Sequence, residues 1–144
     1  FNFDEFYREV IRVLKPDGIL AAWTYNRVEI SPGIDRLVDQ YYGEILAGYW
    51  PERIHYLEER YETIPFPFEE IVPPSFVMEI NWNLIQLAGF LDSWSATQKY
   101  KAQKGHHPFE VIWPKLVAAW GNENDQRLIR WPLHFRIGRN KSTL

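Results

Sequence analysis

The sequence contains no cysteine, which excludes a disulfide framework and thiolate chemistry. None of its eight glycines forms a GxGxxG-type cluster, and no strand precedes the first helical pattern, so the phosphate-loop and dinucleotide-binding interpretations both fail. A signal peptide, a lipidation motif and a long apolar run are also missing from the printed residues. Because these absences are compatible with a reducing compartment, we expect a cytoplasmic protein with no membrane partner.

Basic charge is scarce as well. The net charge is −3 and the pI is near 5.8, which argues against nucleic-acid and anionic-membrane binding, since both favour basic surfaces. By contrast, 17% of the 144 residues are aromatic, and a hydrophobic share of 46% is typical of a globular domain. The seven Trp, eight Tyr and nine Phe must fill a core or line a pocket.

The first 26 residues predict a helix, a tight turn and a strand in immediate succession. Apolar side chains recur at helical spacing between residues 3 and 14, and Pro16 ends this helix because proline cannot continue the hydrogen-bond ladder. Pro16-Asp17-Gly18 supplies turn chemistry. The unbroken apolar run over residues 19–23 is typical of a parallel strand that is covered on both faces.

Polar side chains follow this strand at Thr24, Tyr25 and Asn26. A helix, a turn and a parallel strand make half of a βαβ unit, and ligands in open α/β sheets bind beyond the carboxyl ends of the strands. We therefore expect Tyr25 and Asn26 to contact a substrate.

The string from Phe6 to Asn26, FYREVIRVLKPDGILAAWTYN, resembles the segment of class I S-adenosylmethionine-dependent methyltransferases of the type 11 group that leads into their fifth strand. Arg12 to Gly18 is its most recognisable part, although family members usually have glycine where Asp17 stands. Further landmarks follow in the order of the trans-aconitate methyltransferase-like branch: Tyr49-Trp50-Pro51, Tyr61 with Pro65-Phe66-Pro67-Phe68, Gly89-Phe90-Leu91, Ser93-Trp94-Ser95, Trp120-Gly121 and Trp131-Pro132-Leu133.

The resemblance implies an α/β class, with a partial Rossmann-like methyltransferase fold that contains strands five to seven and flanking and inserted helices. It implies the C-terminal half of a methyltransferase domain, without the main cofactor loop, so that the chain alone is inactive. Residues 1–26 would form a helix, a turn and the fifth strand, residues 27–74 an inserted cover, and residues 75–144 the sixth strand, helices and the seventh strand. The family's strand order would place strand seven between strands five and six.

Within the cover, Ser31-Pro32 predicts the start of a helix of about four turns with an apolar stripe up to Gly48. A short amphipathic piece follows over residues 54–61. Pro65 to Phe68 alternates prolines with aromatics, which predicts an ordered loop held by ring packing.

In the third segment, apolar residues alternate over residues 76–82 and predict a half-buried edge strand. We expect Asn83 to cap one helix, and Ser95 with Gln98 to form the capping box of a second helix that ends at Gly105.

A further helical pattern ends at Gly121 and contains Pro114, which must kink the helix or mark its first turn. The last strand is expected over residues 133–139, with Pro132 at its start. We set aside a metal site at His106-His107, because adjacent imidazoles lack the i, i+4 geometry or a third nearby ligand.

The resemblance implies methyl transfer from S-adenosyl-L-methionine to a small-molecule acceptor whose pocket this half supplies. Trp94 lies in the region that faces the substrate in the resembled branch, but a buried packing tryptophan is equally open. Tyr42 either lines the pocket or is a surface tyrosine. Arg53 either binds a substrate carboxylate or is a solvated charge. Phe1 and Phe3 are expected near the edge of the cofactor.

Methyl transfer from a sulfonium to a carboxylate needs no general base and no metal, so no catalytic residue is assigned. A second hypothesis is non-catalytic. If the first four strands are absent, the backbone groups on one edge of strand five are unpaired. We expect a second copy or a separate N-terminal half to cover that edge. A sugar-binding module is disfavoured because the aromatics are at core spacing.

Overall fold

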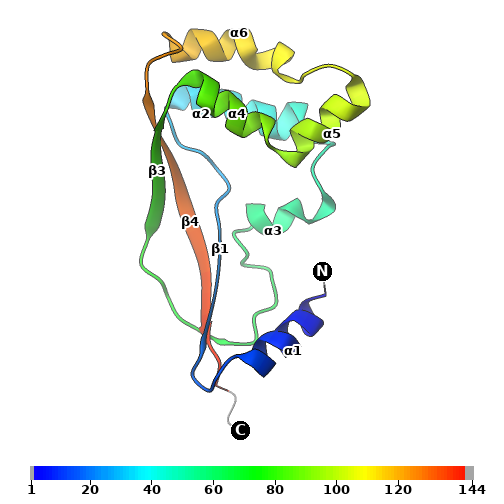
Figure 1. Ribbon diagram of the computed structural model, residues 1–144, viewed down its shortest axis with the longest axis vertical. Coiled ribbons are helices and arrows are strands. Elements are labelled where there is room, and N and C mark those ends of the chain that lie inside the picture. The colour runs from blue at the N-terminus through cyan, green and yellow to red at the C-terminus, as the bar shows by residue number, and fades with distance from the viewer. Residues whose placement is uncertain (1, 142–144) are drawn as a thin grey trace. The chain divides into compact units, whose positions relative to one another are not determined.

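The computed structural model describes residues 2–141 and has a mixed α/β fold (Figure 1). Two compact units divide the chain. The first unit contains the residues up to 26, residues 55–77 and the residues from 132 onward. The second contains residues 27–54 and 78–131. The strands β3 and β4 run from one unit into the other.

The first unit begins with α1, Phe3–Val13, whose N-terminus is capped by Asn2. The Asn2 side chain accepts hydrogen bonds from the backbone N–H groups of Asp4 at 3.0 Å and Glu5 at 3.2 Å. The turn after α1 places Asp17 in the left-handed region with φ 62°. That conformation favours glycine, which accounts physically for the residue that the resembled family usually has there.

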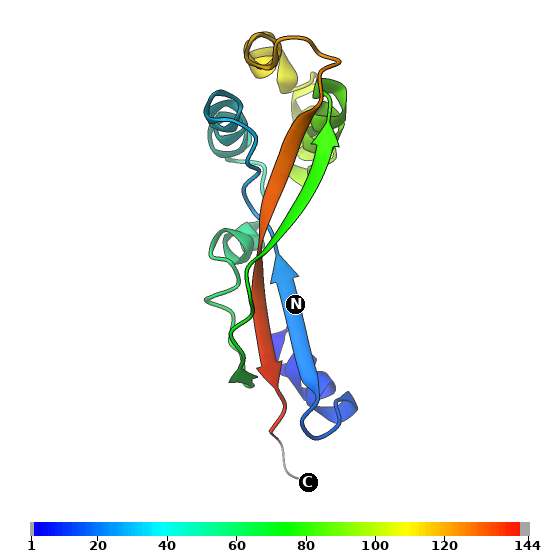
Figure 2. The same cartoon turned by 90° about the vertical axis from the view of Figure 1, so that its left-hand side faces the viewer.

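Three strands pair with β4, Arg127–Arg139. On one side β1, Ile19–Thr24, pairs antiparallel with it, from Ile19 opposite Arg139 to Thr24 opposite His134 (Figure 2). The short β2, Glu69–Glu70, and β3, Phe76–Trp82, also pair with β4. The expected central place of the last strand is confirmed.

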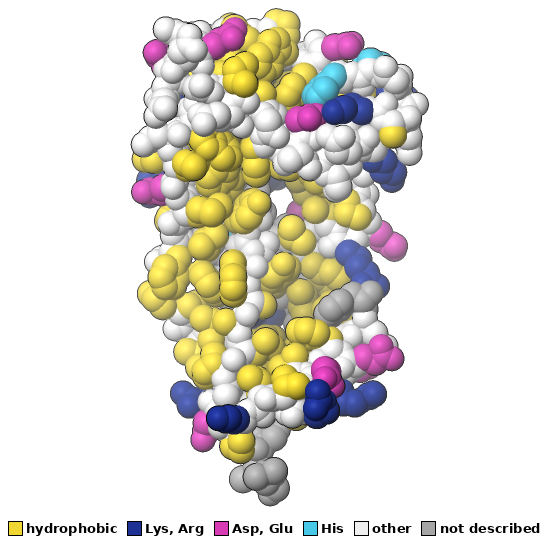
Figure 3. All heavy atoms as spheres, viewed as in Figure 1, with side chains coloured by type: hydrophobic (Ala, Val, Ile, Leu, Met, Phe, Trp, Pro, Cys, Tyr) yellow, Lys and Arg dark blue, Asp and Glu magenta, His cyan; other side chains and the backbone are white. Residues whose placement is uncertain are grey.

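Two expectations about the strands are wrong. The strand β1, which pairs antiparallel with β4, is not covered on both faces, because Ile19 is 45% exposed and Trp23 is 61% exposed. The β3 strand is exposed along almost its whole length instead of half-buried. Figure 3 shows hydrophobic side chains along the strands on the face that it draws. The alternation of apolar residues therefore reports a strand but not which face is covered in this chain.

The face of the first unit opposite the exposed Ile19 and Trp23 side chains is covered by α1 and by the loop before β2. Tyr7 of α1 packs edge-on against Phe66 and Phe68 of that loop, with ring centroids 6.3 and 5.8 Å away. A Cβ atom at Gly138 of β4 would lie 2.5 Å from the Cβ of Phe68 and 2.6 Å from a ring carbon of Phe66. The loop can approach the strand only because residue 138 is glycine, and the expected ring-packed loop is confirmed.

The second unit is helical, and its helices pack around one aromatic-rich core. They are α2, Pro32–Gln40, a π-helical turn η1, Tyr41–Ile45, a 3₁₀ turn η2, Glu52–Ile54, α4, Leu84–Asp92, α5, Ser95–Lys104, and α6, Phe109–Trp120. The short α3, His55–Glu58, belongs to the first unit. Fully buried side chains of the core include Ile34, Tyr41, Leu46, Leu84, Leu87, Leu91, Ile112, Leu116 and Trp120.

The helix boundaries correct two expectations. Ser95 and Gln98 form no capping box, because Trp94 is the N-cap of α5 and makes no side-chain capping bond. The capping box of this region belongs to α4: the Asn83 side chain accepts from the N–H of Gln86, whose side chain accepts from the N–H of Asn83. The expected cap at Asn83 and the helix end at Gly105 are confirmed.

Pro132 also differs from expectation, and one of the two alternatives for Pro114 is excluded. Pro132 lies inside β4 and not at its start, just beyond the last β1 pair, where no β1 carbonyl needs its missing N–H. Pro114 lies inside the continuous helix α6, so it does not mark the first turn. The four-turn helix of the cover exists, but it continues past Gln40 as the π-helical turn η1.

Candidate functional site

The carboxyl end of β1 carries three polar residues of the first unit. Thr24 is buried, and its hydroxyl donates to the carbonyl of Tyr25 at 3.2 Å. Asn26 donates from Nδ2 to the carbonyl of Glu58 at 3.4 Å, which ties the strand end to α3. Tyr25 is 39% exposed. Tyr25 and Asn26 thus follow directly on β1, and Tyr25 is accessible to a ligand.

His134 of β4 lies directly opposite Thr24, in the last pair of the β1–β4 register. Residues opposite each other in an antiparallel pair project from the same face, so the imidazole lies beside Thr24 at the carboxyl end of β1. Its burial lowers the pKa of His134 below 6.5, and the cation of Arg60 lowers it further, whereas Glu62 acts in the opposite direction. The imidazole is therefore neutral at physiological pH.

The segment beside His134 has an unusual backbone. Arg60 and Tyr61 have φ values of 55° and 64°, so two consecutive non-glycine residues are left-handed. Arg136, two residues after His134 on the same face of β4, holds this segment. Its Nη1 donates to the carbonyls of Tyr61 at 2.6 Å, Glu62 at 3.1 Å and Ile64 at 3.3 Å. The strand that carries the imidazole also anchors the strained segment.

An aromatic cluster of the second unit brings together two of the expected pocket residues. Tyr42 packs against Trp50 at 4.4 Å and against Trp94 at 5.8 Å, and Trp50 and Trp94 are 5.5 Å apart. The Trp50 indole N–H donates to the carbonyl of Tyr42 at 3.0 Å, and the guanidinium of Arg27 lies 5.3 Å from the Tyr42 ring centre. The three rings form one half-buried surface with a cation at its edge.

The other expected residues lie on other elements. Arg53 is exposed in η2. Phe3 is half-buried in α1, with its ring 5.5 Å from that of Tyr56 and 6.4 Å from that of Tyr7. Phe1 lies outside the described residues. Tyr25, Asn26 and Phe3 thus belong to the first unit, and Tyr42, Trp94 and Arg53 belong to the second.

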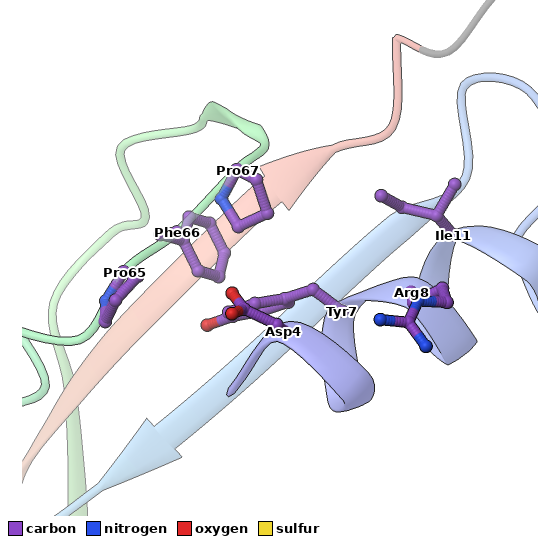
Figure 4. Close-up of a pocket in the computed structure, with 7 residues that line it drawn as sticks. All are labelled: Asp4, Tyr7, Arg8, Ile11, Pro65, Phe66 and Pro67. Carbon is purple, nitrogen blue, oxygen red and sulfur yellow. The ribbon is translucent and has the colours of Figure 1, made fainter. Parts of the chain in front are cut away.

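A shallow groove of about 530 Å³ opens between α1 and the ring-packed loop (Figure 4). Tyr7 and Phe66 point toward each other across it, and Asp4, Arg8, Ile11, Pro65 and Pro67 complete its lining. Burial raises the pKa of Tyr7, which Arg136 partly opposes, so its phenol is neutral. The sequence predicted the ring-packed loop but not the groove beside it.

No cluster of three or more potential metal ligands occurs between residues 2 and 141. Nε2 of His107 lies 2.7 Å from Oδ1 of Asp92, and the other ring nitrogen, Nδ1, accepts a hydrogen bond from the N–H of Phe109 at 3.0 Å. Because that nitrogen is an acceptor, the nitrogen facing Asp92 carries the proton, and His107 joins the ends of α4 and α6. Over the same residues, no helix combines the length and apolar character that crossing a bilayer requires.

Comparison with known proteins places this geometry in context. No family model matches the chain. A protein of Dictyostelium discoideum, provisionally named as a methyltransferase, is 29% identical over 133 residues, which are 90% of this chain and 51% of that protein. A solved structure from Anaeromyxobacter dehalogenans, provisionally described as a type II methyltransferase, is 36% identical, and the match covers 96% of this chain and 59% of that one with a TM-score of 0.89.

The chain has a methyltransferase fold. It spans about half the length of the curated relative that it matches. The mixed α/β architecture described above agrees with this fold.

Sequence reasoning missed three contributors to these sites: Trp50, His134 and Arg136. Trp50 was recognised as a family landmark but not as a neighbour of Tyr42 and Trp94. His134 and Arg136 alternate with apolar residues in the last strand, which indicated a strand but not what faces it. The register of β4 against β1 is the information that the sequence alone did not contain.

Proposed function

We propose that this chain is part of an S-adenosylmethionine-dependent methyltransferase of the type 11, trans-aconitate methyltransferase-like group, that it acts on a small-molecule acceptor in the cytoplasm, and that it supplies the acceptor pocket. The observation that carries the proposal is the match of 96% of the chain to a methyltransferase structure at 36% identity. In this proposal the chain corresponds to the C-terminal half of the domain, and the main cofactor loop lies outside it.

Two groups of residues are the proposed contacts of an acceptor, and each group lies within one unit. Tyr25 and Asn26 follow the carboxyl end of β1, where ligands of open α/β sheets bind. Tyr42 and Trp94, together with Trp50, offer a flat half-buried aromatic surface for an acceptor to pack on. Arg53 would contribute a charge that is not buried, which costs little desolvation before it pairs with a ligand. Contacts of this kind orient an acceptor for in-line transfer.

S-adenosylmethionine, when bound, would supply a methyl group on a positively charged sulfur. Of the residues assigned to it here, Phe3 presents an apolar ring, a type of surface that packs against adenine. The donors and carboxylates that would hold the rest of this cofactor are not among the assigned residues. The residues present therefore fit one edge of the cofactor only.

Calorimetric titration tests the proposal. S-adenosylmethionine and S-adenosylhomocysteine should bind the full-length protein stoichiometrically, and they should not bind the isolated 144-residue chain. Transfer of a tritiated methyl group to a panel of small molecules should then fall in Trp94→Ala and Tyr25→Phe, but not in Ile85→Ala, an exposed control on α4. Failure of the full-length protein to bind either compound would overturn the proposal.

A second candidate function is assembly without catalysis, which a specific observation favours. Ile19, Trp23 and Phe76 expose apolar side chains on the strands, and the only strand paired with β1 among residues 2–141 is β4. A row of unpaired backbone groups beside apolar side chains is a template for association. A second copy of the chain would cover this surface in the assembly hypothesis.

Sedimentation distinguishes the two candidates. The assembly hypothesis predicts a dimer of the 144-residue chain that dissociates in Trp23→Thr, whereas Val13→Thr, which changes an equally exposed residue of α1, should leave it intact. A heterodimer formed only with a separately expressed N-terminal half would instead support a divided methyltransferase. A stable monomer that binds no hydrophobic dye would contradict the assembly hypothesis.

A further inference from the structure

Three features converge at the carboxyl end of β1. His134 is paired with Thr24 at the last position of the register, so its imidazole lies on the face from which the buried Thr24 projects. Tyr25 and Asn26 follow immediately along the chain. In open α/β folds this end of a strand is where ligands bind, so the imidazole lies beside the expected acceptor site.

The surroundings of His134 keep its imidazole in the form that can accept a proton. The charged groups that act on it are the cation of Arg60 and the carboxylate of Glu62, both from the segment after α3, and Arg136 is the next charged residue on the same face of β4. Partial burial and Arg60 together outweigh Glu62 and lower the pKa of His134. A neutral imidazole beside a cation can accept a hydrogen bond at physiological pH.

The segment that supplies Arg60 is held in a strained conformation. Two consecutive left-handed residues, Arg60 and Tyr61, are unfavourable for side chains with a Cβ atom. The three hydrogen bonds from Arg136 to the following carbonyls, and its ion pair with Glu70 at 2.6 Å, offset that cost. Strain of this kind is concentrated at functional sites, where the surrounding structure fixes it.

We propose that His134 is a catalytic residue that hydrogen-bonds the acceptor and takes its proton during methyl transfer. The inference rests on the proposed function and deepens it, because a general base is useful only for an acceptor with an ionisable O–H or N–H group, such as a phenol or an amine. The acceptor's O–H or N–H bond breaks and its proton moves to an imidazole nitrogen. The electron pair left on the acceptor forms the bond to the methyl carbon, whose bond to sulfur breaks with both electrons remaining on sulfur.

In this arrangement Arg60 and Arg136 are positioning residues. Arg60 keeps the imidazole neutral between reactions, and Arg136 keeps Arg60 beside it. A carboxylate acceptor would have the opposite requirement, because it carries no proton to remove and would favour the protonated imidazole. The charge state of His134 in the presence of a bound molecule therefore reports which kind of acceptor the site takes.

NMR titration of the His134 ring in the full-length protein tests the inference without any methyl transfer. Phenol, which donates a hydrogen bond to neutral imidazole, should lower the pKa of His134, and anisole, which has the same ring but no O–H, should leave it unchanged. Arg60→Gln should raise the pKa of His134 without added phenol. A rise on addition of benzoate with no response to phenol would identify an anion site and overturn the inference.

A second measurement separates this inference from the proposed function. His134→Gln should bind S-adenosylmethionine as tightly as the unchanged protein, yet its methyl transfer to phenol should fall at least 100-fold and lose the tenfold rise in rate per pH unit below the pKa of His134. If the unchanged protein binds no S-adenosylmethionine, the proposed function fails. The phenol titration then still tests whether the His134 imidazole accepts a hydrogen bond from a bound acceptor. Equal rates and equal pH profiles in both proteins would overturn the inference.

Discussion

Arg136 donates a hydrogen bond of 2.6 Å from Nη1 to the carbonyl of Tyr61, a residue 75 positions earlier in the sequence. The same guanidinium reaches two further carbonyls and the carboxylate of Glu70, and it lies 4.6 Å from the ring centre of Phe66. Only 12% of the Arg136 side chain is exposed, so these interactions are largely protected from water. One side chain of β4 therefore fixes the loop that covers the inner face of the first unit.

Replacing Arg136 by Met keeps the aliphatic stem and removes all the donors. Three carbonyls then lose a charged partner, and we expect the free energy of unfolding to fall by on the order of 2–3 kcal/mol. Chemical denaturation measures this, and proteolysis between residues 60 and 64 should become faster. Arg130→Met is the matched control, because the ion pair of Arg130 with Glu79 is about half exposed and contributes little. Equal losses in the two variants would contradict the assigned role.

Gly138→Ala tests the close approach of the loop to β4. The added Cβ would lie 2.5 Å from Phe68 and 2.6 Å from Phe66, and overpacking of this kind costs about 1–3 kcal/mol. Gly89→Ala is the control, because no atom lies within 4 Å of the added Cβ and α4 should gain about 0.5–1 kcal/mol from a better helix former. Thermal unfolding should therefore shift in opposite directions for the two variants.

Local rules predicted the elements of this chain well. The helix over residues 3–13, the strand after it and the cap at Asn83 follow from spacing, proline and capping chemistry that act within a few residues. The capping box was placed on Ser95 because Gln98 follows at the right distance, yet Gln98 instead donates to the backbone carbonyl of Asp92 at 2.5 Å. A partner outside the helix competed for the same side chain, and sequence spacing contains no information on such a competitor.

The candidate site was less predictable for the same reason. Tyr25 and Asn26 were identified because they follow a strand, which is a local feature. His134 and Arg136 matter through contacts with residues more than 70 positions away, and those contacts depend on strand register and on the left-handed turn at Arg60 and Tyr61. Arginine and tyrosine do not favour the left-handed conformation, so the sequence did not predict the turn.

The two capping assignments can be separated by a pair of alanine substitutions. Asn83→Ala removes the acceptor for the N–H of Gln86 and should destabilise the protein by about 1 kcal/mol. Ser95→Ala should change stability by less than about 0.5 kcal/mol, because its hydroxyl caps nothing in α5. Urea unfolding of both variants measures the difference. A larger loss in Ser95→Ala than in Asn83→Ala would restore the capping box that the sequence suggested.

The pH dependence of stability tests the environment of His134. Its pKa in the folded protein lies below 6.5, the value expected when the chain is unfolded. As the pH falls through 6.5, the unfolded chain binds a proton at His134 before the folded protein does, so this residue's contribution to stability falls until the pH passes below the folded pKa. His134→Gln should remove this part of the pH dependence, and Arg60→Gln should reduce it because one cause of the lowered pKa is gone. Urea unfolding between pH 4.5 and 8 measures these slopes, and identical slopes with and without His134 would show that the imidazole is not held in its neutral form.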